Sequence, residues 1–179
     1  MCLKWLGFTA LLSGITCAGC GYRSANSVPA HAPLGVTAAP FKTPHPEALE
    51  AALSGVRAGL SQSGVLAPGD AYPRVVVELL RVDELPAGIA ATGPSEAAVP
   101  LARGSAVGVV GRAWVLSSAG APPANDTGDV RRVEYVAQSS EPVTSRFAYA
   151  SAVRSAARKL GEALARRILG SPEPGTDPM

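Results

Sequence analysis

Two segments of the chain repeat apolar residues at the spacing of an amphipathic α-helix, and this periodicity constrains the fold more than any other feature. In residues 43–64, Leu49, Leu53, Val56 and Leu60 recur every three or four positions, which places them on one side of a helix. Prolines lie in or before the first turn and a glycine closes the segment, as helix ends prefer. The pattern therefore predicts a helix that packs on one side.

The second helical segment covers residues 145–170 and is also apolar on one side. That side consists of Tyr149, Val153, Ala156, Leu160, Leu164 and Ile168. The rest of the segment is basic, and Arg166 and Arg167 lie in the last turn, where cations interact favourably with the helix dipole. Both helices therefore need an apolar surface to cover, because packing of the apolar side supplies most of a helix's stability.

Four runs are candidate strands that offer that surface, at 34–41, 74–85, 106–118 and 130–140, and the second has a high content of β-branched residues. In the second run, Val75, Val77 and Leu79 alternate with a second set, Val76, Leu80 and Val82, on the other face. The last two runs are expected to pair as an antiparallel hairpin.

The element order is then β-α-β-β-β-α, followed by a proline-rich tail at 171–179 that we expect to be disordered. Two helices on one face of a four-stranded mixed sheet bury both apolar sides, so we predict a two-layer α+β domain over residues 34–170. Residues 83–105 are rich in Pro, Gly and Ala. We expect them to form a long irregular connection, which in a compact domain is uncommon.

The N-terminal residues contain a short apolar run that ends at a cysteine. Lys4 precedes an uncharged stretch, Trp5 to Thr16, and Ala18-Gly19-Cys20 follows. The stretch is shorter than the about 20 residues that a transmembrane helix needs and has the length of a signal-peptide core. The arrangement resembles the bacterial lipoprotein signal, in which the chain is cut before a cysteine that is then acylated. We therefore expect a signal peptide at 1–19.

On that interpretation, Cys20 carries the lipid, and residues 20–33 form an acylated N-terminus and tether. Cys17 stands where such signals usually have leucine, and cysteine behaves as a small hydrophobe. Gly21 follows the acylated cysteine, which by resemblance to the sorting rule favours the outer membrane. The alternatives are an ordinary secreted or anchored chain, or a redox or metal pair of Cys17 and Cys20, for which no further ligands follow.

No arrangement of residues typical of an active site is present. Gly104–Gly111 departs from the G-x-G-x-x-G spacing and leads into a strand, and Asp83-Glu84 lacks the partners that acid–base chemistry needs. We therefore expect no enzymatic activity, no cofactor and no bound metal. The formal net charge of +2 argues against a nucleic-acid-binding protein, which would be strongly basic.

The basic residues are the remaining candidates for a function. Those on or beside the last two predicted strands are Arg103, Arg112, Arg131, Arg132 and Arg146. They form either a solvated surface or an anion site, because the planar guanidinium binds phosphate with two hydrogen bonds. As candidate lipopolysaccharide- or anion-binding residues we take Arg131, Arg132, Arg112 and Arg146.

Five features of the chain occur together: Cys20-Gly21-Tyr22-Arg23 directly after the signal, the early strand GVTAAPF, the helix PEALEAALSGVRAGLSQSG, the strand VVVELLRV and the basic closing helix. In these features the chain resembles the LptE-type lipopolysaccharide-assembly lipoproteins. The resemblance in element order covers most of the mature chain, and the shared motifs are short.

The resemblance implies a non-catalytic plug and assembly partner of an LptD-type outer-membrane β-barrel. Such a protein contributes to lipopolysaccharide insertion and is lipid-anchored on the periplasmic side of the outer membrane. Of the family's functional residues only Cys20 carries over by position. Small α+β lipoproteins also serve as auxiliary subunits of envelope ABC transporters or secretion complexes, and this remains the alternative function. A hydrolase without recognisable motifs is a weaker third possibility.

Overall fold

The computed structural model describes residues 32–40, 45–89, 102–137 and 142–171. The expected signal peptide, the acylation site Cys20, the tether up to residue 31 and the tail from residue 172 lie outside these residues. The elements in chain order are β1 (Gly35–Ala38), α1 (Pro46–Gln62), β2 (Arg74–Ile89), β3 (Ala102–Leu116), β4 (Val130–Ala137) and α2 (Pro142–Ile168).

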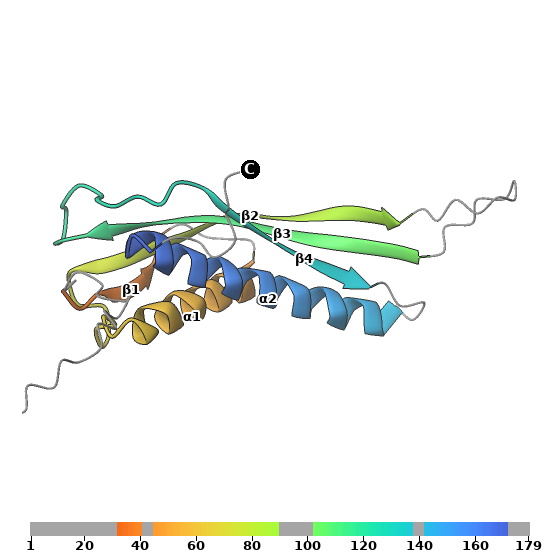
Figure 1. The fold of residues 1–179 in the computed structure, drawn as a ribbon, viewed down its shortest axis with the longest axis horizontal. Helices are drawn as coiled ribbons and strands as arrows, with labels where there is room; N and C mark the ends of the chain where they lie inside the picture. Colours follow the sequence, from red (N-terminus) through yellow and green to blue (C-terminus); the bar gives the residue numbers. More distant parts are fainter. Residues whose placement is uncertain (1–31, 41–44, 90–101, 138–141, 172–179) are drawn as a thin grey trace, which may run out of the picture.

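The strands form one four-stranded sheet in the order β1-β2-β3-β4, and both helices lie on the same side of it (Figure 1). β1 pairs with β2 in parallel, and the other two pairings are antiparallel. The predicted α+β architecture, with its mixed sheet and element order, is therefore confirmed. We call the side of the sheet under the helices the covered face and the other side the open face.

The two helices touch through small residues. A Cβ atom added to Gly161 of α2 would overlap the carbonyl oxygen of Ala52 in α1, and one added to Gly55 would overlap that of Arg158. Only glycine lets the two backbones approach this closely. Leu60 and Leu160 pack beneath the contact and have no exposed surface.

The prediction of an irregular connection over residues 83–105 is wrong at both ends. β2 runs on to Ile89 and β3 begins at Ala102, and these two residues face each other across the ladder. Cross-strand pairing here outweighs the poor strand propensity of Pro, Gly and Ala. Proline has no backbone N–H and therefore cannot donate a hydrogen bond to a neighbouring strand. On the side of β2 away from β3, β1 pairs only with residues 74–77, so no strand among the described residues needs such a bond from Pro86.

A β-bulge at Leu80 changes which side chains of β2 face the helices. The register moves by one residue between Leu79 and Arg81, so Val82 joins the partly buried residues at the helix-covered core rather than the opposite face. The same shift places Arg81 and Asp83 on the open face, opposite Val110 and Gly108 of β3. Bulges commonly redirect side chains in this way.

Candidate functional site on the open face of the sheet

Charged residues from three strands meet on the open face because of the strand register. Arg81 of β2, Val110 of β3 and Arg131 of β4 form one cross-strand row. In a neighbouring row Glu78 lies opposite Arg112. Residues directly opposite on one face have Cβ atoms about 5 Å apart, which is close enough for long side chains to interact.

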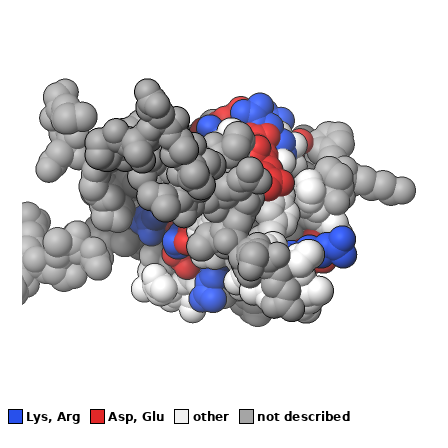
Figure 2. All heavy atoms as spheres, turned by 90° about the vertical axis from the view of Figure 1, so that its right-hand side faces the viewer, with Lys and Arg blue, Asp and Glu red and all other residues white. Residues whose placement is uncertain are grey.

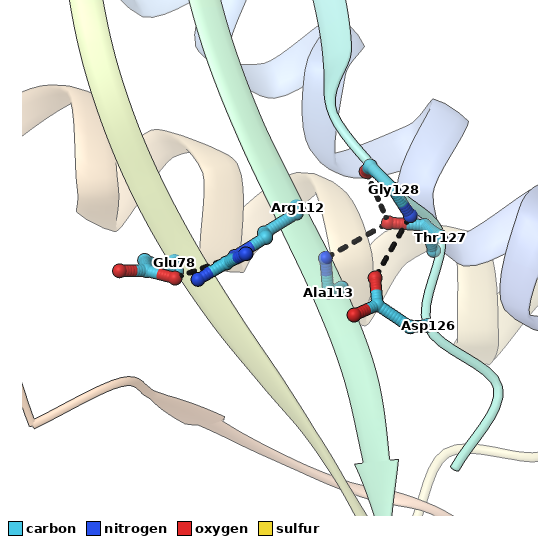
Figure 3. A network of polar contacts seen from close by, with 6 residues as sticks. All are labelled: Glu78, Arg112, Ala113, Asp126, Thr127 and Gly128. Atoms are coloured by element: carbon cyan, nitrogen blue, oxygen red, sulfur yellow. Dashed lines mark hydrogen bonds and ion pairs between the residues drawn. The ribbon is translucent and has the colours of Figure 1, made fainter. Parts of the chain in front are cut away.

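Arg112 forms the shortest contact of the group. Its Nε donates a hydrogen bond to Oε2 of Glu78 at 2.7 Å, and its guanidinium lies 5.6 Å from the centre of the Trp114 ring. The hydrogen bond and the charge of Glu78 raise the pKa of Arg112 above its ordinary value. Arg112 is thus held in place and stays cationic (Figure 3).

Asp83 lies between two arginines on the same face. Its Oδ2 accepts a hydrogen bond from Nε of Arg81 at 3.0 Å, and it lies 4.0 Å from a terminal nitrogen of Arg131. Arg131 reaches Asp83 across Gly108, where a Cβ atom would be only 2.8 Å from that nitrogen. A glycine at this position therefore leaves the space in which the Arg131 guanidinium lies.

Beyond the arginines, toward the end of the β2–β3 pair, the open face becomes apolar. Leu85 and Tyr135 flank Ala106 in one row, and Val133 lies opposite Gly108 in the row before it. Leu85 is 38% exposed, Val133 39% and Tyr135 79%. Cations and accessible apolar surface are therefore adjacent, which suits a ligand with an anionic group next to an apolar part.

The turn before β4 extends the hydrogen bonding along β3. The backbone N–H of Ala113 donates to Oγ1 of Thr127 at 2.9 Å, and the N–H of Thr127 donates to the carbonyl of Ala113 at 2.8 Å. The N–H of Gly128 donates to Oδ1 of Asp126 at 2.8 Å (Figure 3). These bonds set where β4 begins and thereby the position of Arg131.

The structure separates the four arginines that the sequence suggested. Arg112 and Arg131 share the open face, whereas Arg132 alternates to the covered face. There burial, together with the like charges of Arg166 and Arg167, lowers the pKa of Arg132. Arg146 lies exposed near the start of α2. In the view of Figure 2, Lys and Arg side chains (blue) lie at several separate places on the surface.

Sequence reasoning missed Arg81, Glu78 and Asp83 as members of this group. In the sequence Asp83 forms an acidic pair with Glu84, yet the two side chains lie on opposite faces of β2. Plain alternation places Arg81 and Asp83 with Val75 and Val77, on the covered face. No sequence signal locates the bulge that reverses this assignment.

Two further properties concern the described residues as a whole. Within the described ranges, no three His, Cys, Asp or Glu side chains come together as ligands for a metal ion. None of the described helices is both long enough and apolar enough to cross a bilayer.

No protein-family model and no curated protein sequence matches the chain. Among solved structures, a candidate lipoprotein from Caulobacter crescentus CB15 is 8% identical, with 75% of this chain and 86% of that chain covered and a TM-score of 0.49. A minor lipoprotein from Acinetobacter baumannii is 13% identical, with 76% of this chain and 90% of that chain covered and a TM-score of 0.48. Both similarities concern most of the chain at very low identity.

Proposed function

We propose that the protein is a non-catalytic lipoprotein, anchored through Cys20 to the periplasmic side of the outer membrane, that helps to insert lipopolysaccharide. Its protein partner in this proposal is an LptD-type β-barrel. The signal-like residues before Cys20-Gly21 and the LptE-like order of elements support the anchor and the family.

The open face carries the proposal for the ligand. Arg131 lies beside the accessible apolar surface of Val133, Leu85 and Tyr135, and Arg112 lies on the same face one row beyond Arg131. Lipopolysaccharide combines phosphate groups with acyl chains, so it matches both parts of this face. Guanidinium groups bind phosphate through paired hydrogen bonds, and the apolar row offers a surface for the hydrocarbon.

Binding of lipopolysaccharide to the purified protein tests this assignment. Arg131→Glu is expected to weaken binding about tenfold, since a lost charge-assisted hydrogen bond of about 1.5–3 kcal/mol corresponds to at least that factor. The matched control is Arg57→Glu, an equal change of charge at an exposed position on α1, in the other layer. Equal losses in the two variants would show only a general charge effect and would remove the open face from the binding site.

Affinity isolation from membranes tests the partner. A large β-barrel recovered in stoichiometric amount is the expected result. Recovery of an ABC transport complex in its place would favour an auxiliary transporter subunit and contradict the assembly role.

The mass of the mature N-terminus tests the anchor. We expect residues 1–19 to be absent and Cys20 to carry acyl chains, and Cys20→Ala to leave the precursor uncut. An unmodified thiol at Cys20, or a leader still attached to the wild-type chain, would contradict the lipid attachment.

A further inference from the structure

The N-terminal half of α2 extends beyond α1. The close contacts between the helices join Ala52–Gly59 of α1 to Arg158–Ala165 of α2, and in Figure 1 the first turns of α2 continue past the start of α1. In its C-terminal half, α2 is covered by α1 on one side. In the first turns of α2, the same side is not covered by α1. Val143 is 58% exposed there and Phe147 72% exposed.

Cations follow these two apolar residues along the same side of the helix. Val143, Phe147, Arg154 and Arg158 are separated by four, seven and four residues, which is the spacing of a single helical stripe. Ser151 lies within the stripe and is exposed, as are Arg154 and Arg158. We call these five residues the α2 stripe.

The charge of α2 is strongly one-sided. The helix contains six basic residues and a single acidic one, Glu162, whereas the rest of the chain contains ten basic and thirteen acidic residues. Glu162 lies 3.5 Å from Arg158. The described residues offer no ion-pair partner to Arg146 or Arg154, so the start of the helix presents positive charge next to exposed apolar side chains.

We propose that the α2 stripe rests on the surface of a membrane that contains anionic phospholipid. The proposal depends on the lipid attachment proposed at Cys20. Lys and Arg side chains near an anionic bilayer are attracted by its negative surface potential. Phe147 and Val143 can enter the headgroup region while the arginine side chains reach the phosphates.

The high exposure of Phe147 and Val143 favours a lipid surface over a protein partner. Phe147 and Val143 project from a helix ridge, and a fluid bilayer can adapt to such a ridge without a complementary pocket. The lipid proposed at Cys20 also keeps the stripe close to the bilayer. For a short tether, the effective concentration of the stripe at its binding surface is in the millimolar range. The contact then consists of Phe147, Val143 and the neighbouring arginines, of which Arg146 and Arg154 have no ion pair within the described residues.

Fluorescent labels on the full-length lipoprotein in vesicles test the proposal. A single thiol is introduced by Ser151→Cys in the stripe or by Ser54→Cys, an exposed position on α1. The vesicles consist of phosphatidylethanolamine, with or without phosphatidylglycerol, and carry nitroxide groups on the lipid headgroups. We expect severalfold stronger quenching at position 151 than at 54 with phosphatidylglycerol. Arg154→Glu, Phe147→Ser or high salt should remove the difference.

The other outcomes contradict either the docking of the α2 stripe or the lipid attachment at Cys20. Protein that floats with the vesicles but is quenched equally at both positions, or equally without phosphatidylglycerol, would overturn the docking alone. Protein that floats with neither type of vesicle would overturn the lipid attachment, and the docking with it. Shielding of position 151 by a second copy of the protein, without quenching by lipid, would assign the stripe to a protein interface and overturn the docking.

Discussion

The two faces of the sheet differ in what their side chains contact. On the covered face, Val75, Val77, Val107 and Val109 are almost completely buried under the helices. On the open face, Arg112 and Arg131 pair with carboxylates of β2 across the strands, and Tyr135 is largely exposed.

This difference indicates a division of roles between the faces. Burial of apolar side chains under α1 and α2 supplies the stability, since each fully buried aliphatic residue contributes about 1.5–3 kcal/mol. Exposed ion pairs contribute little to stability. The open face is therefore free to vary in chemistry, and a ligand can bind there without disturbing the core.

The largest effect is expected where the helices meet above the covered face. Gly161→Val places side-chain atoms against the backbone of Ala52 and Val56 in α1. We expect a loss of about 3 kcal/mol or more in the free energy of unfolding, measured by urea denaturation, because neither backbone can move away without separating the helices. Ser151→Val in the exposed part of α2 is the control and should cost far less. Similar losses in both variants would contradict the importance of the helix contact.

A smaller effect is expected at the turn before β4, where Thr127 bonds to the backbone of β3. Thr127→Val removes the hydroxyl that accepts the N–H of Ala113. The unfolding free energy should fall by about 1–2 kcal/mol, the cost of leaving a partly buried donor unpaired. Thr127→Ser keeps the hydroxyl and should restore most of the loss in the same denaturation experiment. If serine fails to restore it, the methyl group rather than the hydrogen bond matters.

The stability of the protein should also depend on pH through Tyr149 of α2, which packs against the core between the helices and the covered face. Burial, with a smaller contribution from the charge of Glu84, raises the pKa of Tyr149. Its phenol therefore stays protonated in the folded protein after the unfolded chain has ionised, so this residue should lower stability progressively as the pH rises above about 10. Thermal unfolding at several alkaline pH values should show a shallower decline for Tyr149→Phe. An unchanged decline would show that other groups cause it.

The smallest effect on stability is expected on the open face. Tyr135→Ser should change the unfolding free energy by no more than about 0.5 kcal/mol, as is usual for exposed sites. The same variant should bind lipopolysaccharide more weakly, since it loses apolar contact area. A large loss of stability would show that the open face is part of the structural core, and the division between the faces would fail.

The sequence predicts much of the fold because helix and strand periodicities are local. Leu53, Val56 and Leu60 of α1, and Leu160 and Leu164 of α2, are buried as their spacing predicts. The alternation within β4 also separates Arg131 from Arg132 without any structure. Part of the candidate site was therefore predictable, namely Arg112 and Arg131.

Only the tertiary structure decides which residues of different strands become neighbours. Arg81, Asp83 and Arg131 meet because a bulge in β2 and the register of β3 with both neighbours bring them together. The extended β2–β3 ladder likewise forms from residues with poor strand propensity, because each finds a partner in the other strand. By itself, the sequence determined the order of the elements and their apolar sides through local periodicity. Tertiary structure decided the composition of the open face, because pairing energies between distant residues set the register.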